Sequence, residues 1–347
     1  MSPHHPHCPG AAGPTIDRPS SPGTYCRYHA ADDGGGHSVI HAVLAYLTCP
    51  MCRKDLAVGP GQVRCPAGHT YDLARTGYLT LTTGRAAAPD GDSADMVKAR
   101  EAFLTAGHYA ALADRLATAV HCHQSTIGAY QNNGGESRSA NSGEPENSGE
   151  HAGGEPVVID IGAGTGYYLA HLLRLSPGAV GIAVDASRYA LRRAARAHPR
   201  IGAVGTDVRG PLPIRTAAAS LVLDVFAPRN VTEMHRILRS DGQLVIVIPT
   251  ARHLAEIVGP LGLVTVDERK SERLREKLAG FFVQQDRLTL DLELSLPPDD
   301  LLNLVMMGPT AHHRQASDVR VAIEDRWPHG ASATASFAIE IHRPFPR

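Results

Sequence analysis

In the second half of the chain, short apolar runs alternate with segments that have the spacing of amphipathic helices. The apolar runs predict five strands, at 157–161, 180–185, 201–206, 221–226 and 244–248. The clearest helix is predicted at 187–198, where Pro199 stops it. Another is predicted at 230–238, because Asn230 and Glu233 resemble a capping box. Strands and helices that alternate in this way are typical of a parallel sheet.

The pattern changes after these units. From Leu288 to Leu296 leucines alternate strictly with polar residues, and this period of two predicts one half-buried strand. A second late strand is predicted at 334–342, after a helical insertion. The whole order predicts an α/β fold, a doubly wound, Rossmann-like, seven-stranded sheet that ends in an antiparallel hairpin.

Two polar stretches divide the chain. Residues 1–39 are rich in Gly and Pro and are expected to be a disordered extension, and residues 122–156 a disordered linker. The extension holds a tract that we interpret as part of a flexible terminus rather than a metal site, His4, His5, His7 and Cys8. The other predicted units are a metal-binding domain at 40–85, a helical connector at 86–121 and a large domain at 157–347.

The connector is predicted to hold two consecutive helices. Ser93 is expected to cap the first, and Gly107 marks the break between them. The second has Leu112, Leu116 and Val120 at a spacing of four, which places these side chains on one helical face.

Composition limits the classes of function. Of 347 residues, 43% are hydrophobic and 20% charged, which excludes a wholly disordered chain. The net charge of −1 gives no bulk positive field, so any contact with nucleic acid must come from a local patch. Neither an apolar run of eighteen residues nor an apolar leader occurs, so we expect a cytoplasmic protein.

Three of the six cysteines lie close together in the first block. Cys49 and Cys52 are followed by Cys65 and His69, so that two short loops offer three thiolates and one imidazole. This donor set is typical of a tetrahedral zinc site, and four protein ligands leave no open position for a catalytic water. The sequence therefore predicts a structural zinc ion, with buried free thiols as the alternative.

A glycine-rich turn follows the first strand of the large domain. Gly162, Gly164 and Gly166 would let a ligand approach the backbone at the start of a helix. The third glycine of a dinucleotide fingerprint is replaced by Tyr167, and Asp160 stands two positions before the turn. A carboxylate at this point would repel a pyrophosphate, whereas it suits the ammonium group of S-adenosylmethionine (SAM).

Two further acids follow the next strands. Asp185 ends the second strand and is expected to bind both ribose hydroxyls, and Asp207 follows the third and is expected to bind the adenine amine. Each has a structural alternative, since Asp185 could cap the helix near Ser187 and Asp207 could form a turn. Three acids at three strand ends beside the glycine turn favour a nucleoside cofactor, SAM.

These residues resemble the bacterial 23S rRNA guanine-N1 methyltransferases, which modify the hairpin loop of helix 35. The resemblance runs from about Leu47 to the C-terminus without the linker. It is carried by Cys49-Pro-x-Cys52, Cys65-x-x-Gly68-His69, Tyr71-Asp72-x-Ala74-Arg75-x-Gly77-Tyr78, Gly91-Asp92-Ser93-x-x-Met96-x-x-Ala99-Arg100, Gly107-His108-Tyr109, Asp160-Ile-Gly162-x-Gly164-x-Gly166-Tyr167, Phe226-Ala227-Pro228 and Met307-Gly308-Pro309.

The resemblance implies a class I SAM-dependent methyltransferase domain with an N-terminal zinc ribbon. The family has two branches, which methylate guanine 745 or 748, and the motifs around Phe226 and Met307 are more similar to the second, which includes macrolide-resistance enzymes. A homodimer is implied as well. We expect Phe226 and Pro228 to contact the target base, and Arg100 to contact a phosphate.

Basic residues near the predicted zinc site could supply the local patch that contacts RNA. Arg75 is our candidate for substrate binding, and the others are Arg53, Lys54, Arg64 and Arg85. Solubility is the alternative role for all of them.

Guanine N1 carries a proton, so its methylation needs a base or surroundings that stabilise the N1 anion. The candidates for the base are Asp92, His108 and Asp224, and the alternatives are a helix cap, a packed histidine and a strand-end loop residue. Two other functions stay open. A small-molecule methyltransferase would share the glycine turn but would not need a zinc ribbon, and a non-catalytic zinc-containing RNA-binding protein would not need Asp160 and Asp185.

Overall fold

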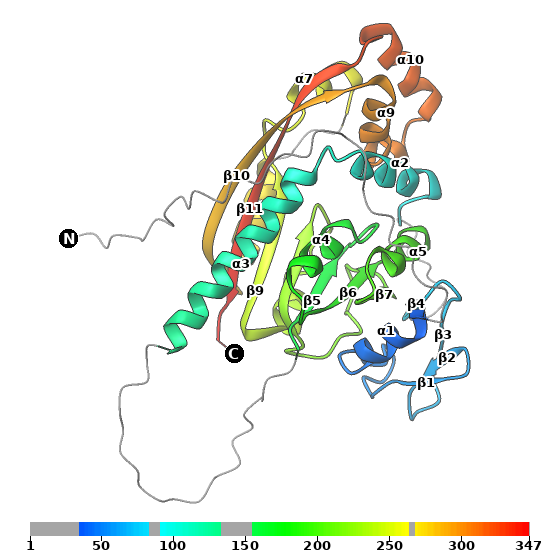
Figure 1. Ribbon diagram of the computed structural model, residues 1–347, viewed down its shortest axis with the longest axis vertical. Coiled ribbons are helices and arrows are strands. Elements are labelled where there is room, and N and C mark those ends of the chain that lie inside the picture. The colour runs from blue at the N-terminus through cyan, green and yellow to red at the C-terminus, as the bar shows by residue number, and fades with distance from the viewer. Residues whose placement is uncertain (1–34, 83–90, 133–154, 264–267, 347) are drawn as a thin grey trace, which may run out of the picture. The chain divides into compact units, whose positions relative to one another are not determined.

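The computed structural model describes residues 35–82, 91–132, 155–263 and 268–346, and Figure 1 shows how their elements are arranged. Eight strands form one sheet in the order β10-β11-β9-β8-β5-β6-β7-β4. Strands β4 to β9 pair in parallel, and β11 pairs antiparallel with both β9 and β10. The bounds are β4 Tyr78–Thr80, β5 Val157–Ile161, β6 Val180–Asp185, β7 Ile201–Gly205, β8 Ala219–Val225, β9 Leu238–Pro249, β10 Phe282–Leu296 and β11 Ala331–Pro344.

Seven of these strands confirm the predicted doubly wound sheet with its antiparallel final hairpin. The alternating leucines lie in β10, where they are buried or half-buried and the residues between them are exposed. Strand β9 begins earlier than predicted, at Leu238, because helix α6 (Val231–Ile237) continues into it without a loop.

The eighth strand, β4, was not predicted and comes from the N-terminal block. It pairs in parallel with β7 over only three residues, which is too short for a period to show in the sequence. The same block is tied to the large domain by the Thr48 N–H, which donates to the Pro213 carbonyl at 2.9 Å, and by a bridge between Leu47 and Ile214. The metal-binding block is therefore built into the edge of the main sheet.

Two apolar clusters, one on each face of the sheet, form the core. Along β5, Val158 belongs to one cluster and Ile159 and Ile161 belong to the other, as expected for a strand buried on both faces. The first cluster includes side chains of α2 Ala94–Thr105, α3 Ala110–Asn132, α4 Tyr167–Leu175, α5 Arg188–Ala197, α7 Ala255–Leu261, α9 Pro298–Met306 and α10 Ala316–Arg326. The second includes α1 Gly35–Leu44, α6 and α8 Glu268–Ala279. Across the described ranges, every helix is too short or too polar to span a membrane.

Two predicted boundaries were wrong. Helix α1 begins at Gly35, inside the segment expected to be a disordered extension, because Ile40 and Val43 are buried and Val43 packs on Gly202 of β7. Helix α3 runs to Asn132, into the expected linker, where no proline interrupts it. The rest of the extension with its His-rich tract, and the linker from 133 to 154, lie outside the described residues.

The two predicted connector helices are confirmed as α2 and α3. Ser93 caps α2 as predicted, since its hydroxyl oxygen accepts the Met96 N–H at 3.2 Å. Only one of the two bonds of the capping box predicted for α6 forms. The Asn230 side chain accepts the Glu233 N–H, but the Glu233 carboxylate accepts from Arg236 instead of from the Asn230 backbone.

Candidate functional site

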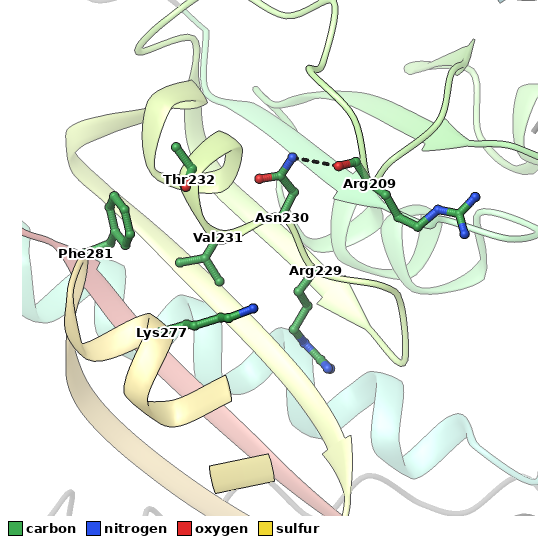
Figure 2. A pocket seen from close by; sticks show the side chains of 7 residues that line it. All are labelled: Arg209, Arg229, Asn230, Val231, Thr232, Lys277 and Phe281. Atoms are coloured by element: carbon green, nitrogen blue, oxygen red, sulfur yellow. Dashed lines mark hydrogen bonds between the residues drawn. The ribbon is translucent and has the colours of Figure 1, made fainter. Parts of the chain in front are cut away.

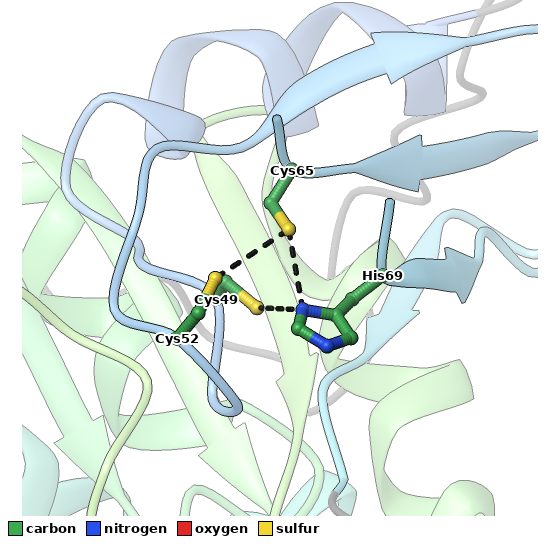
Figure 3. Close-up of side chains that lie close together, drawn as sticks. All are labelled: Cys49, Cys52, Cys65 and His69. Carbon is green, nitrogen blue, oxygen red and sulfur yellow. Dashed lines mark hydrogen bonds between the residues drawn. The ribbon is translucent and has the colours of Figure 1, made fainter. Parts of the chain in front are cut away.

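The four predicted zinc ligands converge in the N-terminal block (Figure 3). The Nδ1 atom of His69 lies 3.5 Å from the sulfur of Cys49 and 3.4 Å from that of Cys65. The sulfurs of Cys52 and Cys65 are 3.6 Å apart, and all four donor atoms lie within 4.8 Å of one another. A tetrahedral zinc ion with bonds of about 2.0 to 2.3 Å spaces its ligands by roughly 3.6 Å. These residues therefore fit a structural zinc ion.

Local backbone bonds and one buried tyrosine hold this zinc site. The block contains a small sheet, β1 Ala57–Gly59, β2 Gln62–Arg64 and β3 Thr70–Asp72. Tyr71 of β3 places its hydroxyl 3.0 Å from the sulfur of Cys49. Burial would raise the pKa of the Cys49 thiol, but hydrogen bonds from Tyr71 and from the Cys52 backbone lower it to about 6. The thiolate is the form that binds zinc, so the surroundings favour the ligand state.

The glycine-rich turn lies between β5 and α4, as predicted. Gly162, Gly164 and Gly166 have φ of 70°, 55° and 76°, in the left-handed region that glycine tolerates. A Cβ on Gly162 would lie 2.4 Å from the Cβ of Ala227, which leaves no room for a side chain. Gly166 is the N-cap and Tyr167 the first residue of α4, so the turn presents backbone N–H groups at a helix start.

Two carboxylates border this turn. Asp185, the last residue of β6, accepts the Gly164 N–H at 2.8 Å through Oδ2 and the Ser187 N–H at 2.8 Å through Oδ1. Asp160 is 2% exposed, and within the described part of the chain its Oδ1 has no hydrogen-bond partner. Burial, followed by the charge of Asp224, raises the pKa of Asp160. A buried carboxyl oxygen that lacks a partner fits a ligand with a donor group, as the ammonium of SAM is.

Asp207 lies at the same edge of the sheet, two residues after β7. Its Oδ1 accepts the backbone N–H of Arg209 at 3.0 Å and pairs with the Arg209 guanidinium at 3.1 Å. Asp207 thus forms the turn that was its alternative interpretation. The contact of its carboxylate with the adenine amine stays a prediction.

Asp92, just before α2, and Arg100 of α2 lie close to the turn and to the end of β6. Ser187, next to the β6 carboxylate, donates through its hydroxyl to the Asp92 carbonyl at 2.6 Å. Arg100 of α2 donates to the Asp92 carboxylate and, at 2.8 Å, to the Met307 carbonyl after α9. A Cβ on Gly164 would lie 3.4 Å from Nη1 of Arg100, so this guanidinium stands against the glycine turn. The expected phosphate ligand Arg100 is therefore placed at the cofactor turn.

Phe226 follows the last residue of β8 and is 41% exposed. Its φ of 60° places it in the left-handed region, which is strained for a residue with a side chain. The ring lies 5.4 Å from that of Phe337 and 6.4 Å from that of Tyr168. The next residue, Ala227, is the one that contacts Gly162, so Phe226 and Pro228 flank the point where β8 meets the glycine turn.

Two of the candidate bases are engaged by partners. Asp92 is paired with Arg100, as described above. The Nε2 atom of His108 lies 3.0 Å from the Asp300 carboxylate, and its ring stacks on Phe103 with centroids 4.7 Å apart. The His108 contact joins the turn after α2 to α9.

The third candidate base, Asp224, is fully buried in β8. Its Oδ1 lies 3.0 Å from Nε of Arg229. Burial raises the pKa of Asp224 to about 7, although the Arg229 charge acts in the opposite direction. Arg229 also borders a cavity of about 400 Å³, and Figure 2 shows the lining side chains Arg209, Arg229, Asn230, Val231, Thr232, Lys277 and Phe281.

The basic residues near the zinc site differ in how freely they face the surface, and their contact with RNA stays a prediction. Arg75 is exposed in the turn between β3 and β4. Arg53, by contrast, donates to the Leu212 carbonyl at 2.7 Å and so helps to join the zinc block to the large domain. Arg85 lies outside the described residues.

Comparisons with known proteins agree with this geometry. The zinc-ribbon family described as "RlmA, N-terminal" matches residues 47–82, and a family described as "Methyltransferase domain" matches residues 159–246. The 23S rRNA (guanine(748)-N(1))-methyltransferase of Streptomyces fradiae is 40% identical over 306 residues, which cover 88% of this chain and 99% of the relative. A Micromonospora griseorubida protein named for 23S rRNA guanine-N1 methylation is 44% identical, over 78% of this chain and 88% of that protein.

The chain belongs to the 23S rRNA (guanine-N1)-methyltransferase family. It is a methyltransferase with a class I fold, its methyl donor is SAM, and its cysteine and histidine cluster holds structural zinc. Among solved structures, a SAM-dependent methyltransferase from Geobacter sulfurreducens in complex with S-adenosyl-L-homocysteine is 15% identical, with a TM-score of 0.35 over 55% of this chain and 86% of that one.

The loop after β9 was not predicted to be part of the site. Its residues Thr250, Arg252 and His253 belong to no motif that was singled out. Thr250 and His253 nevertheless bond to Ser336 of β11, the neighbour of the Phe337 ring that contacts Phe226, and Arg252 pairs with Asp291 of β10. A lone histidine after a strand gives no signal in one sequence, since only pairing across the sheet brings it there.

Proposed function

We propose that this methyltransferase transfers the methyl group of SAM to N1 of a guanine in the helix 35 hairpin of 23S rRNA, at position 748 rather than 745. Two observations favour 748: the motifs around Phe226 and Met307, and 40% identity over nearly the whole length of a relative named for guanine 748. A change in macrolide susceptibility of the ribosome is part of the proposal, and so is the homodimer that the family resemblance implies.

The observation that carries the proposal is the exposed, strained Phe226 beside the glycine turn. A planar ring at the carboxyl end of a central strand can stack on a base taken from a single-stranded loop. Because Ala227 contacts Gly162, a base on Phe226 would lie next to the cofactor turn. A non-glycine residue in the left-handed region costs free energy and persists only where the surrounding structure holds it. Such residues cluster at functional sites.

The residues around the turn suit the parts of SAM. We assign Asp185 to the ribose hydroxyls, Asp160 to the ammonium group and Asp207 to the adenine amine. Arg100, which stands against Gly164, carries the charge that a carboxylate requires, so we propose that it faces the methionine carboxylate rather than an RNA phosphate. SAM supplies an activated methyl group, and the chain's task is to orient guanine N1 toward it.

A hairpin methylation assay tests this function. Purified protein is incubated with methyl-labelled SAM and synthetic helix 35 hairpins in which guanine 745 or guanine 748 is replaced by adenine. We expect label in the hairpin that keeps guanine 748 and background label in the one that lacks it. Label on both, on neither, or only on guanine 745 would contradict the proposed position, and the absence of any label from the unmodified hairpin would contradict the proposed function.

A further inference from the structure

The loop after β9 brings a histidine to the aromatic site. The ring of His253 lies 4.8 Å from that of Phe337, and the ring of Phe226 lies 5.4 Å from the same Phe337. Phe337 is fully buried, whereas His253 is half-buried and Phe226 is exposed. Phe337 is thus the shared packing partner of a proposed stacking residue and of one imidazole.

Hydrogen bonds to β11 fix the orientation of this imidazole. The backbone N–H of Ser336 donates to Nδ1 of His253 at 3.2 Å. Ser336 is itself fully buried, and its hydroxyl accepts from Thr250 at 2.6 Å and donates to Asp291 at 2.5 Å. The Leu254 N–H donates to the Thr334 carbonyl at 2.8 Å, so the loop is anchored on both sides of His253.

These bonds also determine which ring nitrogen carries the proton. Because Nδ1 accepts the Ser336 N–H, the neutral ring must hold its hydrogen on Nε2. Burial lowers the pKa of His253 to about 4, so the ring stays neutral at physiological pH. Among the described residues, no protein group is hydrogen-bonded to Nε2, which leaves this N–H as an available donor.

Backbone strain points to the same place. Within the described ranges four non-glycine residues have positive φ, and two of them are Phe226 at 60° and Leu254 at 57°. Leu254 directly follows His253. Among the described residues, three from outside β11 pack a ring on Phe337, and two of them, Phe226 and His253, lie at or next to a strained position, whereas the third, Tyr109, does not. Strained backbone is typical of sites where a fold holds a functional group in place.

We propose that His253 recognises the target guanine by donating its Nε2–H to O6. This inference rests on the proposed function. Methyl transfer forms the N1–carbon bond and breaks the sulfur–carbon bond of SAM, while the N1 proton is released to water. As that proton leaves, negative charge develops on O6, and a fixed neutral donor stabilises it. Such a donor supplies the surroundings that favour the N1 anion, whereas Asp92, His108 and Asp224 are each engaged by a partner.

Two substitutions separate this role from a purely structural one. Asparagine at 253 places an amide oxygen near the former Nδ1, where it can accept the Ser336 N–H, but it provides no donor near Nε2. Glutamine reaches further and places its amide N–H near the former Nε2 while losing the Ser336 contact. Recognition of O6 therefore predicts that His253→Gln is more active than His253→Asn, and packing against Ser336 predicts the reverse.

The experiment measures single-turnover methylation of the helix 35 hairpin by wild type and both variants at saturating SAM. We expect His253→Asn to lose about 100-fold in rate, the size of effect seen when one donor to a developing oxyanion is removed, and His253→Gln to keep at least ten times the rate of His253→Asn. His171→Ala is the control, since His171 is also half-buried but pairs with Asp114 on α3. Equal rates, or a faster His253→Asn, would overturn the proposal.

A second measurement tests the proposal even if the His253→Gln variant does not fold. Wild type and His253→Asn are compared on hairpins that carry guanosine or 6-thioguanosine, whose sulfur is a weak acceptor. We expect the sulfur to slow wild type by at least ten-fold relative to guanosine and to leave the already slow His253→Asn unchanged. An equal effect on both proteins would overturn the proposal. If wild type does not methylate the guanosine hairpin, the proposed function itself fails.

Discussion

The carboxylate of Asp185 accepts the backbone N–H of Gly164 at 2.8 Å, and this bond ties the end of β6 to the glycine turn after β5. The second carboxylate oxygen accepts the Ser187 N–H, and the Ser187 hydroxyl donates to the carbonyl of Asp92, which lies just before α2. One acid is therefore bonded to the turn directly and, through Ser187, is linked to Asp92.

Substitution of this acid should affect cofactor binding first. We expect Asp185→Ala to weaken SAM affinity by at least about ten-fold, equivalent to one lost charge-assisted hydrogen bond, with little change in affinity for the RNA hairpin. Isothermal titration calorimetry with SAM and a filter-binding assay with RNA measure the two affinities. Asp241→Ala is the control, since Asp241 pairs with Arg239 at the start of β9. Unchanged SAM affinity would count against the ribose assignment.

Two substitutions of Phe226 separate the role of its ring in methylation from the cost of its backbone strain to stability. Glycine tolerates φ near 60° and alanine does not, so we expect Phe226→Gly to be more stable than Phe226→Ala by about 1 kcal/mol. Both variants remove the ring and should lose most hairpin methylation while SAM binding persists. Urea denaturation and the methylation assay check the two parts. An active Phe226→Ala protein would refute the stacking role.

Loss of a zinc ligand should unfold the N-terminal block rather than lower turnover slightly. Because β4 of that block forms the edge of the main sheet, we expect Cys52→Ala to lose zinc and to lower the melting temperature of the whole protein. Met51→Ala is a matched control, because the neighbouring Met51 is 58% exposed and is no ligand. Elemental analysis and differential scanning calorimetry provide the readouts. Retained metal with normal melting would show that the assignment of Cys52 is wrong.

The raised pKa of Asp224 predicts how the free energy of unfolding depends on pH. Its pKa of about 7 in the folded state exceeds the value of about 3.9 in an unfolded chain, so the folded state holds the proton more tightly. Stability should therefore fall as pH rises from about 4 to about 7, by up to about 4 kcal/mol for this group. We expect Asp224→Asn to flatten this slope in urea titrations at pH 5 and pH 8, relative to wild type and to Asp241→Asn. An unchanged slope would show that Asp224 is ionised throughout.

The sheet and the zinc ligands could be predicted because their signals are local. Apolar runs mark β5 to β9, a period of two marks β10, and the spacing of Cys49, Cys52, Cys65 and His69 is itself a ligand pattern. Strand β4 was missed since three residues cannot show a period, and its pairing with β7 depends on contacts distant in sequence.

The residues proposed to bind SAM could largely be predicted from the sequence, whereas those proposed to act on the target guanine could be predicted less well. Asp160, Asp185 and the glycines lie where the order of strands places them. The position of Arg100 against Gly164 depends on how α2 folds back over the sheet, and that of His253 depends on the antiparallel pairing of β11 with β9. No periodicity encodes either contact, because each joins segments that only tertiary packing brings together.

The central claim is tested most directly by mass mapping of methylated nucleotides in 23S rRNA from cells with and without this chain. We expect one additional methyl group on N1 of guanine 748 in cells that express the chain, and a smaller methylated fraction at that guanine in cells that express Asp185→Ala. An unmodified helix 35 in the presence of the folded, zinc-loaded wild-type protein would contradict it.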